Sequence, residues 1–324
     1  MSKTRYFFSI DTGDDIRTTS RSSKESNTDI YARGQLKVVG TTDTAVGEVG
    51  AWIEFRANLH GVGGGNTDLF INDNAFGWWK MTPELTLIGG YTDTLSNIGY
   101  GYDGACNCYY TDNALVALNP GDTTQLRLAY ASGPISFAIA LEDGDQEYEA
   151  LFGDLHIADS LGVAGEIKYA GDTFSGEISG GYWNKGKDSE PDVVVTEAWQ
   201  VGAGLGFSFD PVSLSLAAGA GQDRIGFDYW KASALASANL SDSVHAEVAY
   251  GYASSKGDVP ILAIDYSVKT HAVLAGIYYD PVSQLTIGLE GEWFRNNKEV
   301  SGFMGYAQSK ETTWQADLVT VFRF

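Results

Sequence analysis

Apolar and polar residues alternate along much of this chain with a period of two. In the segment LGVAGEIKY, Val163, Ile167 and Tyr169 occupy alternate positions, and Glu166 and Lys168 fall between them. The same alternation recurs in residues 49–59, 135–142, 244–252, 285–293 and 314–324. Because side chains at positions i and i+2 share one face of a strand, the pattern predicts β-strands with an apolar and a polar face.

Short and long connections between these strands also alternate. The short ones contain the turn residues Pro, Gly, Asp and Ser, and they are expected at residues 42–47, 80–85, 131–134, 170–173, 209–213, 240–243 and 279–284. Longer polar connections are expected at residues 11–29, 60–67, 94–122, 143–160, 184–196, 222–228, 255–267 and 296–310. The segments between them predict an all-β fold of about sixteen antiparallel strands, with both ends of the chain on the short-turn side.

A closed sheet explains this pattern better than a soluble sandwich does. A sandwich turns its apolar faces toward a shared core and has no systematic asymmetry of connections. The interior of a sixteen-stranded barrel is too wide for side chains to fill, so its polar face lines a lumen and its apolar face meets lipid. Aromatic residues near strand ends, such as Trp79, Tyr169, Tyr278 and Tyr279, are then expected in two interfacial girdles. The alternative is that these aromatic residues pack in an ordinary β core.

The last segment, WQADLVTVFRF, is itself an alternating strand. Trp314, Leu318 and Phe322 fall on one face, and Asp317 and Arg323 fall on the other. We expect this strand to pair with the first one, around residues 5–11, because that pairing closes the barrel and leaves no open edge.

Composition narrows the class of protein further. The net charge of −21 argues against nucleic acid as the main partner, since phosphate binding needs clustered Lys and Arg. With 39 Gly, 18 Tyr and 15 Phe against 7 Pro, the chain suits an extensive antiparallel sheet. No segment approaches the roughly 20 apolar residues of a transmembrane helix. The opening MSKTRYFFSIDTGDD lacks the apolar run of a signal peptide, so we expect a mature or recombinant form with an added start.

Four stretches resemble one protein family. They are NAFGWWKMTPELTLIGGYTDTL, NIGYGYDGACNCYYTDNA, NPGDTTQLRLAYASGPISFAIALED and the terminal WQADLVTVFRF. They resemble the trimeric general porins of Gram-negative outer membranes, and most closely the alphaproteobacterial porins. The match is most specific over residues 75–145, where ALEDGD departs slightly from the VALEEP-like stretch of those porins. The resemblance implies one 16-stranded transmembrane barrel over residues 1–324, with short periplasmic turns, long extracellular loops and a homotrimeric state.

The resemblance also implies a pore constriction. In this family the third long loop folds into the barrel, and residues 94–122 are the longest connection here and the third in order. Acidic residues on that loop and basic residues on the facing wall would form a polar neck that passes ions. The predicted constriction residues are Asp103, Asp112, Asp122, Arg5, Arg33, Lys37, Arg56 and Arg127. The alternative for each is a charge that only solvates a wide lumen.

Other motifs carry weaker signals. Cys106 and Cys108 lack the further ligands of a metal site, so a strained disulfide is favoured slightly over two free thiols. No metal ion or other cofactor is expected. GVGGGN lacks the Lys-Ser/Thr of a phosphate loop. No Ser, His and Asp set has a recognisable nucleophile context, so no catalytic residue is assigned and an outer-membrane barrel enzyme is disfavoured. In QEYEALFGDLHIADS, helix-like spacing of Tyr148, Leu151 and Leu155 predicts a short amphipathic helix over the barrel rim.

The sequence therefore predicts an integral outer-membrane porin without enzymatic activity. We expect a water-filled channel for passive diffusion of ions and small hydrophilic solutes, with moderate cation selectivity because the lumen-facing positions are slightly acidic. Its expected partners are two further copies of the chain, outer-membrane lipid and lipopolysaccharide. Two other functions stay open: a channel selective for a sugar or small acid, and, less favoured, a surface structural or adhesion barrel.

Overall fold

The computed structural model describes residues 3–20, 24–60, 71–97, 121–150, 153–188, 195–259, 264–302 and 305–323. Nearly all of these residues lie in β-strands. The strands are β1 (Lys3–Ser20), β2 (Lys24–Thr44), β3 (Gly47–His60), β4 (Ile71–Lys80), β5 (Leu85–Asp93), β6 (Asp122–Ser132), β7 (Ile135–Asp143), β8 (Gln146–Ala150), β9 (Gly153–Ala158), β10 (Leu161–Ala170), β11 (Phe174–Trp183), β12 (Lys187–Asp188), β13 (Ala198–Phe209), β14 (Val212–Gln222), β15 (Asp228–Ser241), β16 (Val244–Val259), β17 (Ile264–Val282), β18 (Leu285–Gly302) and β19 (Gly305–Arg323). Within the described residues, no helix has the length and apolar character needed to cross a bilayer.

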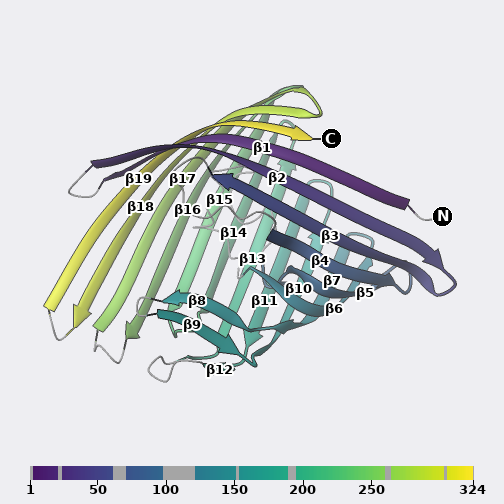
Figure 1. Cartoon of the computed structure of the whole chain (residues 1–324), viewed down its shortest axis with the longest axis horizontal. Coiled ribbons are helices and arrows are strands. Elements are labelled where there is room, and N and C mark those ends of the chain that lie inside the picture. The colour runs from purple at the N-terminus through teal and green to yellow at the C-terminus, as the bar shows by residue number, and fades with distance from the viewer. Residues whose placement is uncertain are drawn as a thin grey trace.

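Sixteen of the described strands form one closed antiparallel barrel (Figure 1). The order around the wall is β1-β19-β18-β17-β16-β15-β14-β13-β11-β10-β7-β6-β5-β4-β3-β2. The first and last strands pair in register, with Ser9 opposite Arg323 and Asp11 opposite Val321. The predicted closure through the terminal strand is therefore confirmed, and so is the all-β fold.

The two faces of the barrel have opposite character. Side chains facing outward are large and apolar and stay exposed, and they include Leu126, Phe137, Ile139, Leu141, Val163, Ile167, Ile178, Val201, Val248, Ile277, Leu289 and Leu318. Side chains facing inward are small or polar and are buried, and they include Ala138, Ala140, Glu54, Glu142, Glu177, Ser179, Gln200, Glu247, Glu290, Glu292 and Asp317. A fold with charged side chains inside and apolar ones outside is that of a transmembrane β-barrel.

The connections at the two ends of the barrel differ as predicted. One end, the short-turn end, carries tight turns such as Thr44–Gly47 and the two-residue link between β6 and β7. At the other end, the long-loop end, several predicted loops are instead continuations of the barrel strands. The pairing of β1 with β2 runs unbroken from Lys3 opposite Thr41 to Ser20 opposite Lys24, so most of residues 11–29 is strand. Two strands of a hairpin are held by backbone hydrogen bonds, which form whether or not the side chains are apolar. The predicted strand boundaries were wrong because they were placed where the sequence becomes polar.

The predicted helix over residues 146–160 is wrong. The segment forms β8 and β9, which pair with Tyr148 opposite Leu155, and β12 completes a separate three-stranded sheet. Residues that would share a helical face are instead cross-strand neighbours. A short apolar run fits a two-residue and a 3.6-residue period almost equally well, so the sequence pattern alone does not separate a strand pair from a helix.

Tyr278 does not belong to the aromatic girdle. Trp79, Tyr169 and Tyr279 are exposed on the outer wall as predicted, but only 1% of Tyr278 is exposed. Its hydroxyl donates a hydrogen bond to Glu290 Oε1 at 2.9 Å. A side chain at Gly288 would collide with its ring, so this glycine leaves room for an inward tyrosine.

Candidate functional site

The chain turns into the barrel directly after β5. Leu95 has 1% of its surface exposed, and it packs against Ala138, Ala140 and Ala164 on the inner wall. Thr94 Oγ1 lies 2.9 and 2.8 Å from the two carboxylate oxygens of Glu142 on β7, and the Leu95 amide donates to Glu142 Oε1 at 3.0 Å. Residues 94–97 therefore start the third long connection on the inside of the barrel.

Further contacts fix this turn to strands far along the wall. Gln200 Nε2 on β13 donates to the carbonyl and the hydroxyl of Ser96 at 2.8 and 2.9 Å, and Ser179 on β11 donates to the same carbonyl at 3.2 Å. Tyr229 on β15 holds Gln200 in turn, through a 2.8 Å hydrogen bond to its Oε1. In barrel order β11 and β13 are four and five strands from β5, so the turn crosses the inner face of the wall.

Trp183 covers the anchor of this turn. Its indole donates a hydrogen bond to the Glu142 carboxylate, and Glu142 has no exposed surface. A side chain at Gly162 or Gly181 would collide with the indole, so both glycines are needed for the ring to lie against the inner wall. Gly162 lies directly opposite Trp183 in the β10–β11 pair, and a Trp facing a Gly in this way is the sequence signal for the inward indole.

Arg127 is the predicted constriction residue that lies closest to this turn. It faces inward, donates from Nη2 to the Asp93 carbonyl at 2.6 Å and from Nε to Gln125 Oε1 at 2.9 Å. Gln125 Nε2 donates to the carbonyls of Thr92 and Asp93 at 3.0 and 2.8 Å. The guanidinium therefore supports the end of β5 where the chain turns inward, as well as contributing positive charge to the wall.

A second cluster of inward charges lies on β2 and β3. Lys37 Nζ is 3.4 Å from Glu54 Oε2 and 5.5 Å from the centre of the Trp52 ring. Trp52 Nε1 donates to Glu54 Oε2 at 3.1 Å, and Gln35 Nε2 donates to Glu54 Oε1. Arg56 follows Glu54 on the same face. The structure thus brings Lys37 and Arg56 together with a buried carboxylate that also faces the lumen.

The other predicted constriction residues are placed by register or lie outside the described residues. Arg5 lies opposite Val39 on β2, and Arg33 lies opposite Asn58 on β3. By the alternation of the strands, the positions of Arg5 and Arg33 are on the same inner side as those of Lys37 and Arg56. Asp122 is the first residue of β6, opposite Asp93, and shares the parity of the outward Leu126, so it is not grouped with Arg127. Asp103, Asp112, Cys106 and Cys108 lie outside the described residues.

Carboxylates dominate the inner face of β16 to β19. Glu247, Glu290 and Asp317 lie in one row, because Glu247 and Glu290 are both opposite Gly276 and Glu290 is opposite Asp317. On β10 and β11, Lys168 Nζ is 2.8 Å from Glu166 and 3.4 Å from Glu177. Lys269 shares the outward parity of Val273 and Ile277, so it adds no positive charge to this inner face. The inner wall over these strands is therefore acidic.

Arg224 is a buried residue at the long-loop end that the sequence did not point to. Its Nη2 donates to the Gly144 carbonyl and to Ser160 Oγ at 2.8 and 2.9 Å, and its Nη1 donates to the Asn184 carbonyl. It thereby ties together three connections. Beside it, burial raises the pKa of Asp223, although backbone amides including that of Phe227 donate hydrogen bonds to the carboxylate and oppose this rise.

These features define the class of the fold: a sixteen-stranded transmembrane barrel with a polar, charged interior and a third connection that turns inward. The sequence matches no protein-family model. No curated protein matches it either. The structure is similar to the anion-selective porin from Comamonas acidovorans, with a TM-score of 0.69, 14% identity and coverage of 100% of both chains.

Two more solved structures share the fold. The outer-membrane channel DcaP of Acinetobacter baumannii has a TM-score of 0.67 and 14% identity, with 100% of this chain and 97% of that chain covered. OmpF of Salmonella typhi, in complex with daunomycin, has a TM-score of 0.67 and 12% identity, with 99% of this chain and 97% of that chain covered. The fold is therefore that of Gram-negative outer-membrane porins. The narrower likeness to alphaproteobacterial porins stays a prediction.

Within the described residues, no group of three or more His, Cys, Asp or Glu side chains is arranged to hold a metal ion. The arrangement of charges suits another task. Fixed carboxylates and cations on a wide polar wall can replace part of the water shell of a passing ion without binding the ion tightly.

Proposed function

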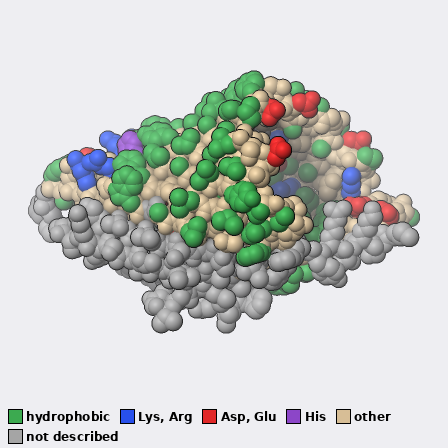
Figure 2. Space-filling view, turned by 90° about the horizontal axis from the view of Figure 1, so that it is seen from above, with side chains coloured by type: hydrophobic (Ala, Val, Ile, Leu, Met, Phe, Trp, Pro, Cys, Tyr) green, Lys and Arg blue, Asp and Glu red, His purple; other side chains and the backbone are tan. Residues whose placement is uncertain are grey.

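We propose that this protein is an outer-membrane porin, a water-filled channel for passive diffusion of ions and small hydrophilic solutes. The observation that carries the proposal is the inverted pattern of the closed barrel, with charged side chains inside and large apolar side chains outside. Figure 2 shows a hollow in the molecule with Asp and Glu side chains on its rim. Such a wall can face lipid on its outer side and water on its inner side. Diffusion through the enclosed channel needs no cofactor or energy source.

We further propose that residues 94–122 narrow this channel. The support is the inward turn at residues 94–97, which Glu142, Ser179 and Gln200 hold against the inner wall. A connection that starts inside the barrel reduces the cross-section available to solutes. In this account Lys37, Arg56 and Arg127 supply positive charge to the wall, and Asp103 and Asp112 supply negative charge on the connection.

Moderate cation selectivity is the first expected property. A unit charge about 8 Å from an ion in water contributes about 0.5 kcal/mol, so removing one lumen charge changes the local concentration of each ion roughly twofold. Arg56→Ser is therefore expected to raise the permeability ratio of K⁺ to Cl⁻, and Asp112→Asn is expected to lower it. The zero-current potential across a planar bilayer under a KCl gradient measures both changes.

A matched control separates lumen charge from total charge. Lys185→Ser removes one positive charge from an exposed position on the connection after β11. Screening over about 8 Å at physiological salt makes that charge nearly invisible to an ion in the pore. A wild-type potential with the sign of chloride preference would contradict the proposed selectivity. The Comamonas acidovorans porin, which has the same fold, is anion-selective. The fold therefore does not determine whether cations or anions are preferred, and we expect the side chains of the lumen to determine it.

A homotrimer is the second expected property. Gly34 and Ala51 are outward positions on β2 and β3, and a side chain at Gly34 would meet no atom within 4 Å. Small residues let neighbouring walls approach closely, as they do between membrane helices. Gly34→Trp is expected to convert trimers into monomers in native mass spectrometry in mild detergent. Gly176→Trp, at an outward position on β11 far from β2 and β3 around the barrel, is the matched control and is expected to leave trimers intact. A wild-type protein that is only monomeric would contradict this proposal.

Liposome swelling with a series of uncharged sugars and amino acids of increasing size tests the function itself. A general porin gives rates that fall smoothly with solute size. One solute that enters far faster than its size allows would instead indicate a selective channel. No swelling with any solute, from a barrel that is correctly folded, would contradict the proposed pore and favour a structural or adhesion role.

A further inference from the structure

Three aromatic side chains form a run on the inner face of β3 and β4, which we call the inner aromatic run. Trp52 lies opposite Phe76 in this strand pair, and Trp78 follows two residues after Phe76 on β4. The ring centres of Trp52 and Phe76 are 5.9 Å apart, and those of Phe76 and Trp78 are 6.1 Å apart. All three share the inward parity of the buried Glu54, whereas Trp79 is exposed on the outer wall.

The inner aromatic run leaves ring surface toward the lumen. Trp183 and Tyr278, which also face inward, are covered, with 8% and 1% of their surfaces exposed. Trp52, Phe76 and Trp78 are only half-buried. Trp78 lies over Gly50, where a Cβ atom would be 2.1 Å from the indole, so one face of this ring rests on the wall. Aromatic surface left open in this way marks a place where a ligand can bind.

The Trp52 end of the run already holds an ammonium group, which the chain itself provides. Lys37 Nζ lies over the Trp52 ring, 5.5 Å from its centre, and is 3.4 Å from Glu54 Oε2. Trp52 Nε1 donates a hydrogen bond to the same carboxylate oxygen at 3.1 Å. Ring, carboxylate and ammonium thus form a three-part arrangement, in which the cation meets the negative face of the ring and the charge of the carboxylate.

The Trp78 end repeats two of these three parts. Trp78 Nε1 donates to Glu48 Oε1 at 3.1 Å, the distance that also joins Trp52 to Glu54. Glu48 lies opposite Lys80, but among the described residues no salt bridge joins Glu48 to a cation, and no Lys or Arg lies over the Trp78 ring. The chain therefore supplies the ring and the carboxylate here, and a ligand can supply the ammonium.

We propose that the Trp78 end of the inner aromatic run binds small organic cations that carry a quaternary ammonium group. The ammonium lies over the Trp78 ring as Lys37 Nζ lies over Trp52, and Glu48 supplies the opposite charge. Aromatic faces are suited to quaternary ammonium groups, whose methyl groups contact the ring directly. Glu48 is the second residue of β3, so the site lies near the short-turn end of the channel. The proposal rests on the proposed function and names one class of solute for that channel.

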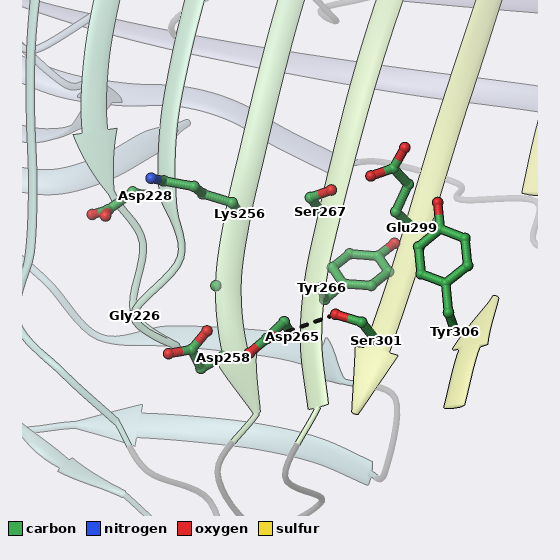
Figure 3. A pocket seen from close by; sticks show the side chains of 11 residues that line it. Gly226, Asp228, Lys256, Asp258, Asp265, Tyr266, Ser267, Glu299, Ser301 and Tyr306 are labelled. Carbon is green, nitrogen blue, oxygen red and sulfur yellow. Dashed lines mark hydrogen bonds between the residues drawn. The ribbon is translucent and has the colours of Figure 1, made fainter. Parts of the chain in front are cut away.

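Carboxylates and tyrosines also meet in a pocket at the long-loop end, which has a volume of about 370 Å³. Figure 3 shows Glu299 and Tyr306 in this pocket, with the Ser301 hydroxyl donating to Asp265 at 3.3 Å. Glu299 has the outward parity of the exposed Leu289 on β18, so a solute in the lumen does not meet it. Glu299 therefore provides a matched control for Glu48.

Block of the single-channel potassium current by choline tests the site in the wild type. The bilayer is made of neutral galactolipid, which has no ammonium headgroup. Choline is compared with dimethylbutanol, in which a carbon atom replaces the ammonium nitrogen. Choline is expected to lower the current in a saturable way, and dimethylbutanol is expected to have no effect. Equal block by the two compounds, or stronger block by an uncharged disaccharide, would overturn the proposal.

Replacing Trp78 tests the contribution of the ring. Trp78→Leu is expected to raise the half-blocking concentration of choline about fivefold, which is roughly what one partly exposed ring contributes to binding a cation. Trp78→Phe keeps a ring and is expected to have a smaller effect. Trp79→Leu removes the adjacent outward Trp and is expected to leave the block unchanged. Equal effects of Trp78→Leu and Trp79→Leu, in barrels with the β-sheet content of the wild type, would overturn the assignment of the site.

Replacing Glu48 tests the contribution of the carboxylate. Glu48→Gln is expected to raise the half-blocking concentration about threefold, since an exposed ion pair contributes about that much to binding. Glu299→Gln changes the net charge equally and is expected to leave the block unchanged. Equal half-blocking concentrations in these two variants would show that Glu48 does not bind the cation, which would contradict the proposed arrangement.

Binding measured without conduction separates this proposal from the proposed function. Broadening of the choline methyl signal in proton NMR reports binding to the protein in an uncharged polyoxyethylene detergent. Broadening that Trp78→Leu abolishes, together with no current steps from the wild type, would support the cation site and refute the pore alone. Normal current steps with neither block nor broadening by choline would refute the cation site and leave the pore intact.

Discussion

Glu142→Ala is expected to release the base of the third long connection from the barrel wall. Glu142 is fully buried and accepts hydrogen bonds from the Thr94 hydroxyl, the Leu95 amide and the Trp183 indole. Each of these buried donors left without an acceptor costs about 1–3 kcal/mol. The connection is expected to move at the turn, which would make the open-channel current noisier and lower the temperature at which the barrel unfolds in detergent.

Two matched variants show whether the anchor itself is responsible. Glu142→Gln keeps a carbonyl oxygen that can accept the Leu95 amide, and its effect is expected to be small. Glu166→Ala removes another inward carboxylate, one that is paired with Lys168 rather than with residues 94–97. A quiet, unchanged current in Glu142→Ala would show that the turn at residues 94–97 does not depend on this carboxylate.

Deleting residues 103–112 is expected to raise the single-channel conductance roughly twofold, because the narrowest section of a pore dominates its resistance. The deletion removes about the middle third of the connection and leaves the Thr94–Ser96 anchor in place. It also removes Cys106 and Cys108, so the same recording with a Cys106→Ser, Cys108→Ser variant shows how much the thiols contribute.

The comparison for this deletion is the removal of residues 261–262, between β16 and β17, which leaves two residues to connect the paired strands. That connection joins two strands that pair up to Val259 and Ile264, and nothing assigns it to the lumen. We expect its loss to leave conductance unchanged. If the deletion of 103–112 also leaves conductance unchanged in a barrel that folds correctly, residues 94–122 do not constrict the pore.

The alternation of side chains was sufficient to predict the barrel, because lipid and water impose opposite demands on adjacent residues of every strand. Val163, Ile167 and Tyr169 had to face one environment, and Glu166 and Lys168 the other. The terminal strand had to find a partner for the same reason that any sheet edge does, and it pairs with β1. The long polar hairpins were harder to predict, because outside the membrane both faces of a strand meet water and the two-residue pattern disappears.

The functional site was only partly predictable. Lys37, Arg56 and Arg127 face inward as their strand parity predicted, but the partners of the inward turn did not follow from the sequence. Ser179 and Gln200 are ordinary polar residues of an inner wall. Only the closed sheet brings them to Ser96, which lies 104 residues before Gln200. Tyr278 was misplaced because the adjacent Tyr279 has the same chemistry. The inward position of Tyr278 depends on Gly276 on the same strand and on Gly288 on the neighbouring strand.

Single-channel recording in a planar bilayer tests the central claim most directly. The purified protein, with its β-sheet content verified by circular dichroism, is added to one side of a zwitterionic bilayer in concentrated KCl. We expect discrete current steps of uniform size whose amplitude rises linearly with voltage, as a permanently water-filled pore requires. A folded barrel that inserts into the bilayer and produces no current steps would contradict the account.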